Sequence, residues 1–342
     1  MDIGEVQRVV RLYNLDGLRG FSAMLVVFGH LFNQLGVLGG IFGDGGAQVG
    51  VQIFFALSGF LMGFLYLRFH IRKLAAIDFL RRRTARVFPM YVAVVLASYL
   101  SLSYAGHPIF YAVNSSNLVE HLLFVKGVSV LWTVPVEVHF YLIFIFIWLV
   151  FSVNRAIGII SLAAMIPVLL FIPDPLAIRP SQLSFFLIGI MASLVPPFRS
   201  NTAFALAVCA IFVAMPAVSK TLGITVFEFW RSPLNVAATG TLLYTSINAP
   251  LAKLTFGSLP ARYIGQISFS VYLLHWPIMA AITTHTDVDD NGPLYVFTVV
   301  VLTLLISSLT YFSIEAPARR WITGRNGWVR NDLASATAVA DL

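Results

Sequence analysis

Residues 15–30 read LDGLRGFSAMLVVFGH, an apolar segment with an arginine near its start and a histidine at its end. Arg19 and His30 are eleven residues apart, about three turns of a helix, so both project from nearly the same face. Their Cα atoms would lie roughly 16 Å apart along the helix axis. Ionisable side chains are costly inside a membrane and mark functional sites there. This stretch therefore predicts a membrane-spanning helix with a polar stripe across half of the bilayer.

The composition of the whole chain is that of an integral membrane protein. Of its 342 residues, 58% are hydrophobic and 11% are charged, and the mean hydropathy is +0.86. A soluble domain carries about 25% charged residues. Residues 1–14 lack the apolar core of a cleavable signal peptide, so the first span is expected to act as the targeting element. Cys209, the single cysteine, lies in an apolar run and is expected to be a small core residue.

Apolar runs of about 20 residues match the ~30 Å hydrocarbon core of a bilayer and predict an all-α, polytopic membrane protein. Ten transmembrane helices are expected, at 18–36, 47–67, 87–105, 133–151, 154–173, 181–196, 202–220, 235–252, 263–284 and 294–314. With the N-terminus in the cytoplasm, inner segments hold seventeen of the 22 Lys and Arg residues and outer segments four, while Arg19 lies at an inner edge. Because such residues concentrate in cytoplasmic loops, both termini are predicted to be cytoplasmic. The same placement of the basic residues argues against a nucleic-acid partner, although the net charge is +7.

These spans predict a single membrane domain. Residues 1–17 would form a cytoplasmic N-terminal segment, 18–322 the ten-helix domain and 323–342 a short cytoplasmic tail, with no further extramembrane domain. The sequence shows no internal repeat and no matching pair of broken helices. Transporters often carry such repeats, so their absence weakens a transporter interpretation without excluding it.

Ionisable residues from distant spans are expected in one layer of the outer half of the bilayer. His30, Glu137, His139 and His275 all fall at this depth when counted from the ends of their spans. A lone buried histidine is usually a packing residue, but a carboxylate at the same depth could make His30 a general base. His139 points nearly opposite to Glu137 on a helix and is expected outside such a site. His121 lies outside the expected spans and carries no signal.

A basic stretch, RFHIRKLAAIDFLRRRTARVFPMY, runs from residue 68 to residue 91 between the second and third spans. It can be interpreted as a topology anchor that contacts anionic lipid headgroups. It can also be interpreted as a cradle for a phosphate-rich cytoplasmic ligand, because arginine binds phosphate oxygens bidentately. Arg83 and Arg86, three residues apart, would face one side, and Arg19 lies at the same level. In the second span, Gly59 and Gly63 are explained by close helix approach.

Six short motifs follow one another along the chain. They are LDGLRG with the spacing from Arg19 to His30, FFALSGF at 54–60, RTARVFP at 83–89, LWTVPVEVHFY at 131–141, ISFSVYLLHWP at 267–277 and IEAPARRW at 314–321. In this order they resemble the acyltransferase 3 family of integral membrane acyltransferases, which includes bacterial exopolysaccharide and lipopolysaccharide O-acetyltransferases. The resemblance covers about residues 12–321. In the fourth motif, Val134 stands where the family has leucine, and Val138 where a second acid or a tryptophan is frequent.

The resemblance implies roles for particular residues. His30 would be the catalytic histidine, and Glu137 would support the site. The residues implied to hold acyl-CoA are Arg19, Arg83 and Arg86. Ser58 and His275 are implied only to line the substrate site. No metal is implied.

The function implied is O-acyl transfer in the inner (plasma) membrane. An acyl group, with acetyl favoured, would pass from cytoplasmic acyl-CoA (acetyl-CoA) to a sugar hydroxyl of a cell-surface polysaccharide or lipid-linked glycan. Membrane lipid and that glycan are the expected partners, and the oligomeric state cannot be read from the sequence. One alternative is a polytopic transporter of a glycan intermediate, with His30 and Glu137 as substrate or proton sites. Another is an inactive scaffold, against which the intact His30 weighs.

Overall fold

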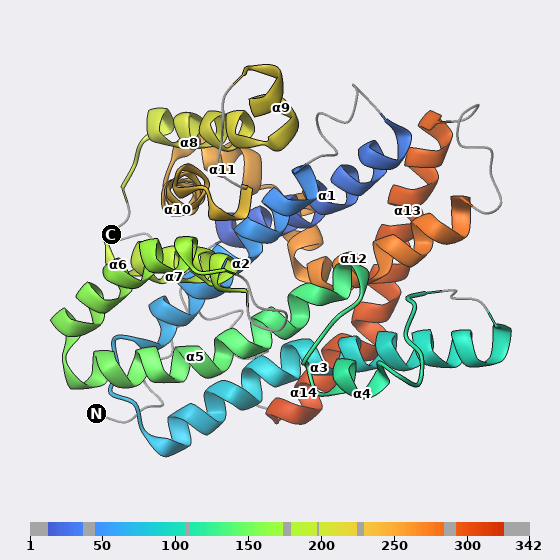
Figure 1. Cartoon of the computed structure of the whole chain (residues 1–342), viewed down its shortest axis with the longest axis horizontal. Coiled ribbons are helices and arrows are strands. Elements are labelled where there is room, and N and C mark those ends of the chain that lie inside the picture. Colours follow the sequence, from blue (N-terminus) through green and yellow to red (C-terminus); the bar gives the residue numbers. More distant parts are fainter. Residues whose placement is uncertain are drawn as a thin grey trace.

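The apolar runs of the sequence form helices throughout the described part of the chain (Figure 1). The computed structural model describes residues 13–36, 45–106, 110–173, 179–196, 198–223, 229–283 and 292–324, and these ranges contain no strand. The longer helices are α1 (Tyr13–Leu35), α2 (Gly46–Tyr66), α3 (Lys73–Ala105), α5 (Thr133–Val153), α6 (Arg155–Phe171), α7 (Pro180–Leu194), α8 (Asn201–Ala214), α10 (Pro233–Ser246), α12 (Leu259–Thr283) and α13 (Gly292–Thr310). The shorter ones are α4 (Leu118–Leu122), η2 (Ser129–Trp132), α9 (Pro216–Thr221), η3 (Phe229–Arg231), α11 (Pro250–Phe256), the π-helical turn η4 (Tyr311–Glu315) and α14 (Ala316–Thr323).

The structure confirms the all-helical prediction and supports a polytopic membrane protein. Five helical stretches are long and apolar enough to cross a membrane: Tyr13–Leu35, Gly46–Tyr66, Lys73–Tyr104, Ser129–Val153 and Gly292–Thr323. The expected spans at 202–220 and 235–252 are each divided, into α8 and α9 before Pro216 and into α10 and α11 before Pro250. Proline lacks the amide hydrogen that would continue a helix. The number of ten spans stays a prediction, as do the predicted terminal segments, most of which lie outside the described residues.

The basic stretch expected to connect the second and third spans is largely helical. α3 runs without a break for 33 residues, with Pro89 in its interior. At 1.5 Å per residue this helix is about 50 Å long, well beyond the ~30 Å of the hydrocarbon core. The expected loop therefore forms the first half of α3, and its arginines are held on a rigid element.

α1 and α12 pack in close contact and run in the same direction. The backbone of Gly265 lies beside Asp16, the ring of His275 beside His30, and the hydroxyl of Thr283 beside Gln34. A Cβ on Gly20 would overlap the carbonyl oxygen of Ala261, so glycine is required where these backbones meet. This packing places the first motif of the sequence against the fifth.

α2 lies between α1 and α7 and is the most buried of the candidate membrane spans. A Cβ on Gly59 would overlap the carbonyl oxygen of Phe186 in α7, which confirms that this glycine allows close helix approach. Ser58 is buried beside it. Because α2 packs against both neighbours, its side chains are held at fixed positions in the interior of the helix assembly.

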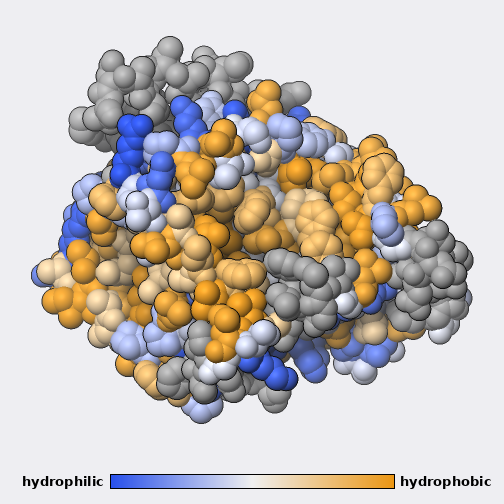
Figure 2. All heavy atoms as spheres, turned by 90° about the horizontal axis from the view of Figure 1, so that it is seen from above, coloured by the Kyte–Doolittle hydropathy of each residue, from blue (hydrophilic) through white to orange (hydrophobic). Residues whose placement is uncertain are grey.

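Large apolar side chains cover much of the outer surface, among them Phe146, Leu206 and Leu309. Figure 2 shows a face on which such side chains predominate. Cys209 is exposed on α8, whose buried side is formed instead by Phe204, Ala207, Ile211 and Ala214. The expectation that Cys209 is a core residue was wrong, because an apolar run in a membrane helix also supplies the side that faces outward.

The connection between α3 and α5 folds inward against α12. The hydroxyl of Tyr111 donates a 2.6 Å hydrogen bond to the carbonyl oxygen of Leu273. His121, which carried no signal in the sequence, is fully buried: its Nε2 accepts from the Val128 amide at 3.1 Å, and its Nδ1 lies 2.8 Å from the carbonyl oxygen of Asn117. A carbonyl can only accept, so Nδ1 carries the proton and the neutral tautomer of His121 is specified. Through these two hydrogen bonds, His121 fixes the conformation of the connection between α3 and α5.

Candidate functional site

Glu137 lies at the centre of a small polar network between α2 and α5. Its Oε1 accepts a hydrogen bond from Ser58 Oγ at 3.0 Å and another from the Tyr141 hydroxyl at 2.7 Å. Tyr141 is one helical turn after Glu137 on the same face of α5. The structure thus brings together Glu137 and Ser58, two residues that the sequence placed in the site from motifs 79 positions apart.

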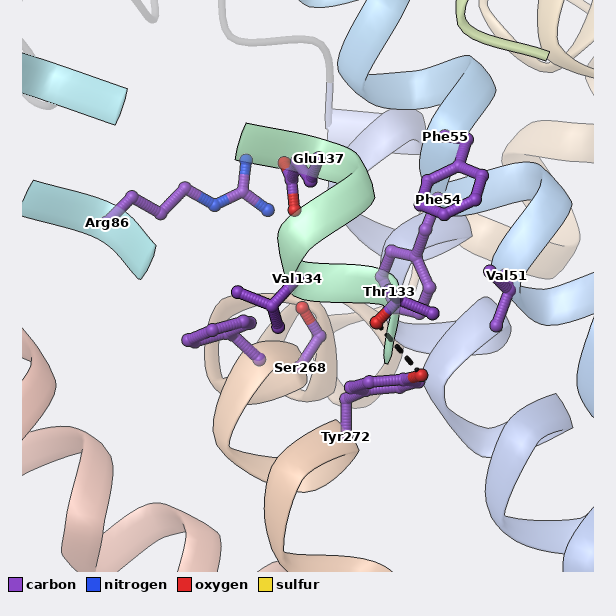
Figure 3. A pocket seen from close by; sticks show the side chains of 10 residues that line it. Val51, Phe54, Phe55, Arg86, Thr133, Val134, Glu137, Ser268 and Tyr272 are labelled. Carbon is purple, nitrogen blue, oxygen red and sulfur yellow. Dashed lines mark hydrogen bonds between the residues drawn. The ribbon is translucent and has the colours of Figure 1, made fainter. Parts of the chain in front are cut away.

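A cavity that is partly open to solvent adjoins this network, and its empty space is about 470 Å³ when the solvent at its mouth is included. It lies between α2, α3, α5 and α12, and its walls combine apolar side chains, including Phe54 and Phe55, with a few polar groups. The polar residues that line it are Arg86, Thr133, Glu137, Ser268 and Tyr272. Figure 3 shows the guanidinium of Arg86 directed toward Glu137, with Thr133 and Tyr272 hydrogen-bonded further along the wall. Apolar walls with convergent polar groups are typical of a small-molecule site.

Of the three arginines expected to bind the donor, Arg86 lines this cavity. Arg83 is only 7% exposed, and its guanidinium lies 5.8 Å from the ring centroid of Phe79 and 6.0 Å from that of Tyr141. Arg19 lies 3.6 Å from Asp16, and Arg83, Arg86 and Glu137 are close enough to act on it electrostatically. Guanidinium groups from two helices therefore converge at one level, an arrangement that suits a polyanion.

A pair of stacked histidines forms a second polar feature. The rings of His30 and His275 lie 5.3 Å apart at 20°, and the edge of Trp276 meets His30 at 5.1 Å. His275 is fully buried, and its Nδ1 lies 3.2 Å from the carbonyl oxygen of Val271, so this nitrogen carries the proton. Its Nε2 has no hydrogen-bond partner within the described part of the chain. His30 is half-buried, which leaves its imidazole partly accessible.

The structure does not bring His30 into contact with Glu137. His30 packs on His275, whereas Glu137 bonds to Ser58 and Tyr141, and no hydrogen bond joins the two groups in the described ranges. Tyr272 lies between them: its ring centroid is 5.9 Å from that of His275, and it also lines the cavity. His30 and His275 do not line the cavity, and Tyr272 is the lining residue whose ring packs near that of His275. His139, which was expected outside the site, does not line the cavity either.

The sequence analysis gave no role to Glu315. This residue ends the π-helical turn η4, is 2% exposed, and accepts a 2.9 Å hydrogen bond from Ser270 Oγ. The available signal was an acid in the motif IEAPARRW, at the end of an apolar run. Among the described residues, no group of three or more His, Cys, Asp or Glu side chains could hold a metal ion.

Known proteins resemble this chain over most of its length. A family model described as an acyltransferase domain (acyltransferase 3) matches residues 12–312. The O-acetyltransferase OatA of Staphylococcus aureus is 25% identical over 94% of this chain and 60% of its own length. The peptidoglycan O-acetyltransferase OatA of Listeria monocytogenes is 25% identical over 90% of this chain and 56% of its own length. The chain therefore spans little more than half the length of these relatives. No solved structure matches it.

Proposed function

Because this chain belongs to the acyltransferase 3 family, we propose that it is a membrane O-acetyltransferase that moves an acetyl group from acyl-CoA to a sugar hydroxyl. The observation that carries this proposal is the cavity lined by Arg86, Glu137 and Tyr272, with the His30–His275 pair beyond Tyr272. A polyanionic thioester needs cationic groups for its phosphates and a passage for its arm. Acyl transfer also needs a group that accepts a proton from the attacking hydroxyl.

The proposal includes ten crossings of the plasma membrane with both termini in the cytoplasm. The parallel packing of α1 and α12 requires α12 to be an odd-numbered span if α1 is the first, as the ninth span of this arrangement is. The charge distribution of the sequence supports the orientation. Arg19, Arg83 and Arg86 would then face the cytoplasm, where acyl-CoA is available, and the histidine pair would lie in the outer half.

In the proposed reaction, the imidazole of His30 takes the proton from the acceptor hydroxyl as its oxygen attacks the thioester carbonyl. The carbon–sulfur bond breaks, and the CoA thiolate leaves and takes up a proton. A covalent variant has His30 itself accept the acyl group before the sugar does. Glu137, whose carboxylate is oriented by the Ser58 and Tyr141 hydroxyls, is proposed to support the transfer step from the cavity wall.

The acceptor is proposed to be a cell-surface glycan, and peptidoglycan is the first to test. The relative from Listeria monocytogenes is named for peptidoglycan, although this chain covers only 56% of that protein. Polysaccharide or lipid-linked glycan acceptors follow from the same chemistry, because each presents sugar hydroxyls. Membrane lipid would surround the helices on the apolar surface.

The deciding experiment follows radiolabelled acetyl from acetyl-CoA in membranes that contain the protein. His30→Ala should lower transfer by at least about 100-fold while the protein still inserts. His139→Ala is the matched control, since it removes an imidazole that neither stacks on His275 nor lines the cavity, and should retain activity. Label on the protein before label on glycan would indicate the covalent variant. Full activity of His30→Ala would refute the assignment, and glycan transport without acetyl transfer would favour the transporter.

A further inference from the structure

Two tryptophans, Trp132 and Trp230, pack against each other beside the cavity. Their ring centroids are 5.8 Å apart, and the rings are nearly perpendicular at 85°. Phe55, which lines the cavity (Figure 3), contacts both of them, at 6.2 Å and 6.5 Å between centroids. Both tryptophans are half-buried, so part of each indole is accessible. The pair is therefore a partly exposed aromatic surface that adjoins the cavity.

The tryptophan pair is too deep to be an interfacial anchor. Interfacial tryptophans lie at the level of the lipid headgroups. Phe55 is nine residues beyond the start of α2, which corresponds to about 14 Å along the helix. Trp132 and Trp230, in contact with Phe55, are therefore recessed into the helix assembly. A position of this kind suits a binding surface better than an anchor.

One face of α7 is directed toward the tryptophan pair. The guanidinium of Arg179, which directly precedes the helix, lies 4.8 Å from the ring centroid of Trp132. Further along the helix, the ring of Phe185 lies 5.8 Å from that of Trp230. Gln182 is three residues from each of these α7 residues, so all three share one side of the helix. The side chain of Gln182 is therefore directed toward the tryptophan pair.

Two buried amide oxygens in this region have no hydrogen-bond partner within the described ranges. Gln182 is 2% exposed, and its Oε1 is unpaired. Asn235 is fully buried; its Nδ2 donates at 3.0 Å to the carbonyl oxygen of Phe229, which precedes Trp230, whereas its Oδ1 is unpaired. An unpaired buried oxygen is unfavourable unless a water or a ligand supplies a donor. Both oxygens can accept hydrogen bonds from hydroxyl groups.

The tryptophan pair is connected to the histidine pair through two residues. Trp132 precedes Thr133, whose hydroxyl donates to the Tyr272 hydroxyl at 3.0 Å. The ring of Tyr272 lies 5.9 Å from that of His275, which stacks on His30. In the proposed topology α5 and α7 begin at the outer side of the membrane. A ligand on the tryptophan pair would therefore approach the proposed base from the side of the acceptor.

We propose that Trp132, Trp230 and Gln182 bind a sugar ring of the acceptor glycan. The faces of a sugar ring carry C–H groups that pack on aromatic rings, and its rim carries hydroxyl groups that need hydrogen-bond partners. Gln182 and Asn235 would accept from these hydroxyls, and Arg179 would donate to sugar oxygens. This inference rests on the proposed function, because it takes the ligand to be the acceptor of acyl transfer. The binding itself can be measured without transfer.

Steady-state acetyl transfer tests the site with two forms of acceptor, soluble peptidoglycan fragments and a polyprenyl-linked disaccharide in vesicles. Trp132→Leu and Trp230→Leu should each raise the KM for the acceptor by about tenfold, the effect of one lost aromatic contact. The KM for acetyl-CoA should stay within about twofold. Trp321→Leu is the matched control, since Trp321 is an exposed tryptophan on α14, and should change neither value. A raised KM for either form supports the site and identifies the form of the sugar that it binds.

Gln182→Leu separates sugar binding from packing. Leucine is of similar size and removes an unpaired buried oxygen, so the unfolding midpoint in lipid nanodiscs should stay the same or rise. The KM for the acceptor should nevertheless increase several-fold. Thr303→Val is the control, because Thr303 on α13 is 1% exposed and its Oγ1 is also unpaired in the described part of the chain. It should affect the midpoint similarly and leave the KM unchanged, whereas a lower midpoint with an unchanged KM for Gln182→Leu would overturn the role of Gln182.

Calorimetric titration with the soluble fragments, without acetyl-CoA, separates this inference from the proposed function. Fragments that bind the parent protein and not the Trp132→Leu variant, without any acetyl transfer, would support the site and contradict the proposed function. Transfer with the acceptor KM unchanged in both leucine variants would overturn the site and leave the proposed function intact. Should these variants fail to fold, Trp132→Phe and Trp230→Phe, which keep an aromatic ring, should show the same pattern more weakly.

Discussion

At the scale of single residues, the hydrogen bonds made by Glu137 determine how its carboxylate is presented to the cavity. The two hydrogen bonds to Glu137 converge on one carboxylate oxygen, Oε1, from Ser58 and Tyr141. Hydrogen bonds from hydroxyl groups to an ionised carboxylate are stronger than those between neutral groups. Glu137 is thereby held in one orientation toward Arg86.

We expect Glu137→Gln to reduce turnover more than donor binding. The amide preserves the shape and one acceptor oxygen but removes the charge that the network orients. The expected loss in kcat is about tenfold or more, with the KM for acetyl-CoA changed by less than about threefold. Ser58→Ala, which removes one of the two donors, should have a smaller effect. A raised KM with unchanged kcat would instead place Glu137 among the donor-binding groups.

At the scale of elements, α3 and the α1–α12 pair position the site. The rigid helix α3 presents Arg83 inward, packed on Phe79 and Tyr141, whereas Arg81 and Arg82 on the same helix pair with Asp78 at 2.6 Å each. One helix therefore carries two arginine pairs with different surroundings, Arg83 with Arg86 and Arg81 with Arg82. Replacing each pair in turn can distinguish donor binding by α3 from contact of α3 with lipid headgroups.

Arg83→Ala combined with Arg86→Ala should raise the acetyl-CoA concentration needed for half-maximal rate by at least about tenfold, because two charged hydrogen-bond donors are lost. Arg81→Ala combined with Arg82→Ala is the matched control and should leave that concentration within about twofold. Steady-state kinetics in vesicles measures both. Equal effects of the two double variants would indicate that residues 68–91 only anchor the protein to the membrane.

Gly20→Ala should separate α1 from α12. The added Cβ would overlap the Ala261 carbonyl oxygen, and overpacking of this kind costs about 1–3 kcal/mol. We expect a lower unfolding midpoint and weaker acetyl transfer, because His30 and His275 are carried by these two helices. Gly46→Ala is the control, since its nearest contact would be at an ordinary 3.6 Å. If both variants behaved like the parent protein, the close approach would not be needed for activity.

At the scale of the whole molecule, the sequence predicts the helices well, because a bilayer requires apolar runs of a given length. Its motifs also predict that Ser58 and Glu137 share a site, and the two are hydrogen-bonded. Depth counting placed Glu137 with His30 and apart from the arginines, whereas Glu137 and Arg86 line the same cavity. It could not predict that His30 faces His275 rather than Glu137, since this depends on how α1 packs along α12. It could not predict the burial of Glu315 either, because a π-helical turn has no simple sequence pattern. The continuity of α3 was missed because an arginine-rich stretch resembles a loop in a hydropathy window.

The proposed topology can be tested with single cysteines. Cys209 is first replaced by serine, because it is exposed and would react. In intact cells, Lys126→Cys should react with a membrane-impermeant maleimide, since the connection after α4 is placed outside. Arg320→Cys on α14 should react only after the membrane is permeabilised. Both positions are exposed in the structure. Labelling of Arg320→Cys in intact cells would contradict a cytoplasmic C-terminus.

The unbroken helix α3 joins the arginines to the connection between α3 and α5. Arg83 and Arg86 lie in its first half, and Tyr91, about 8 Å beyond Arg86 along the helix, donates a hydrogen bond to the carbonyl oxygen of His121. The same connection accepts a hydrogen bond from Tyr272 at the carbonyl oxygen of Val130. A helix moves as one body over so short a distance, so the wall that carries Arg86 and the connection bonded to Tyr272 are mechanically coupled.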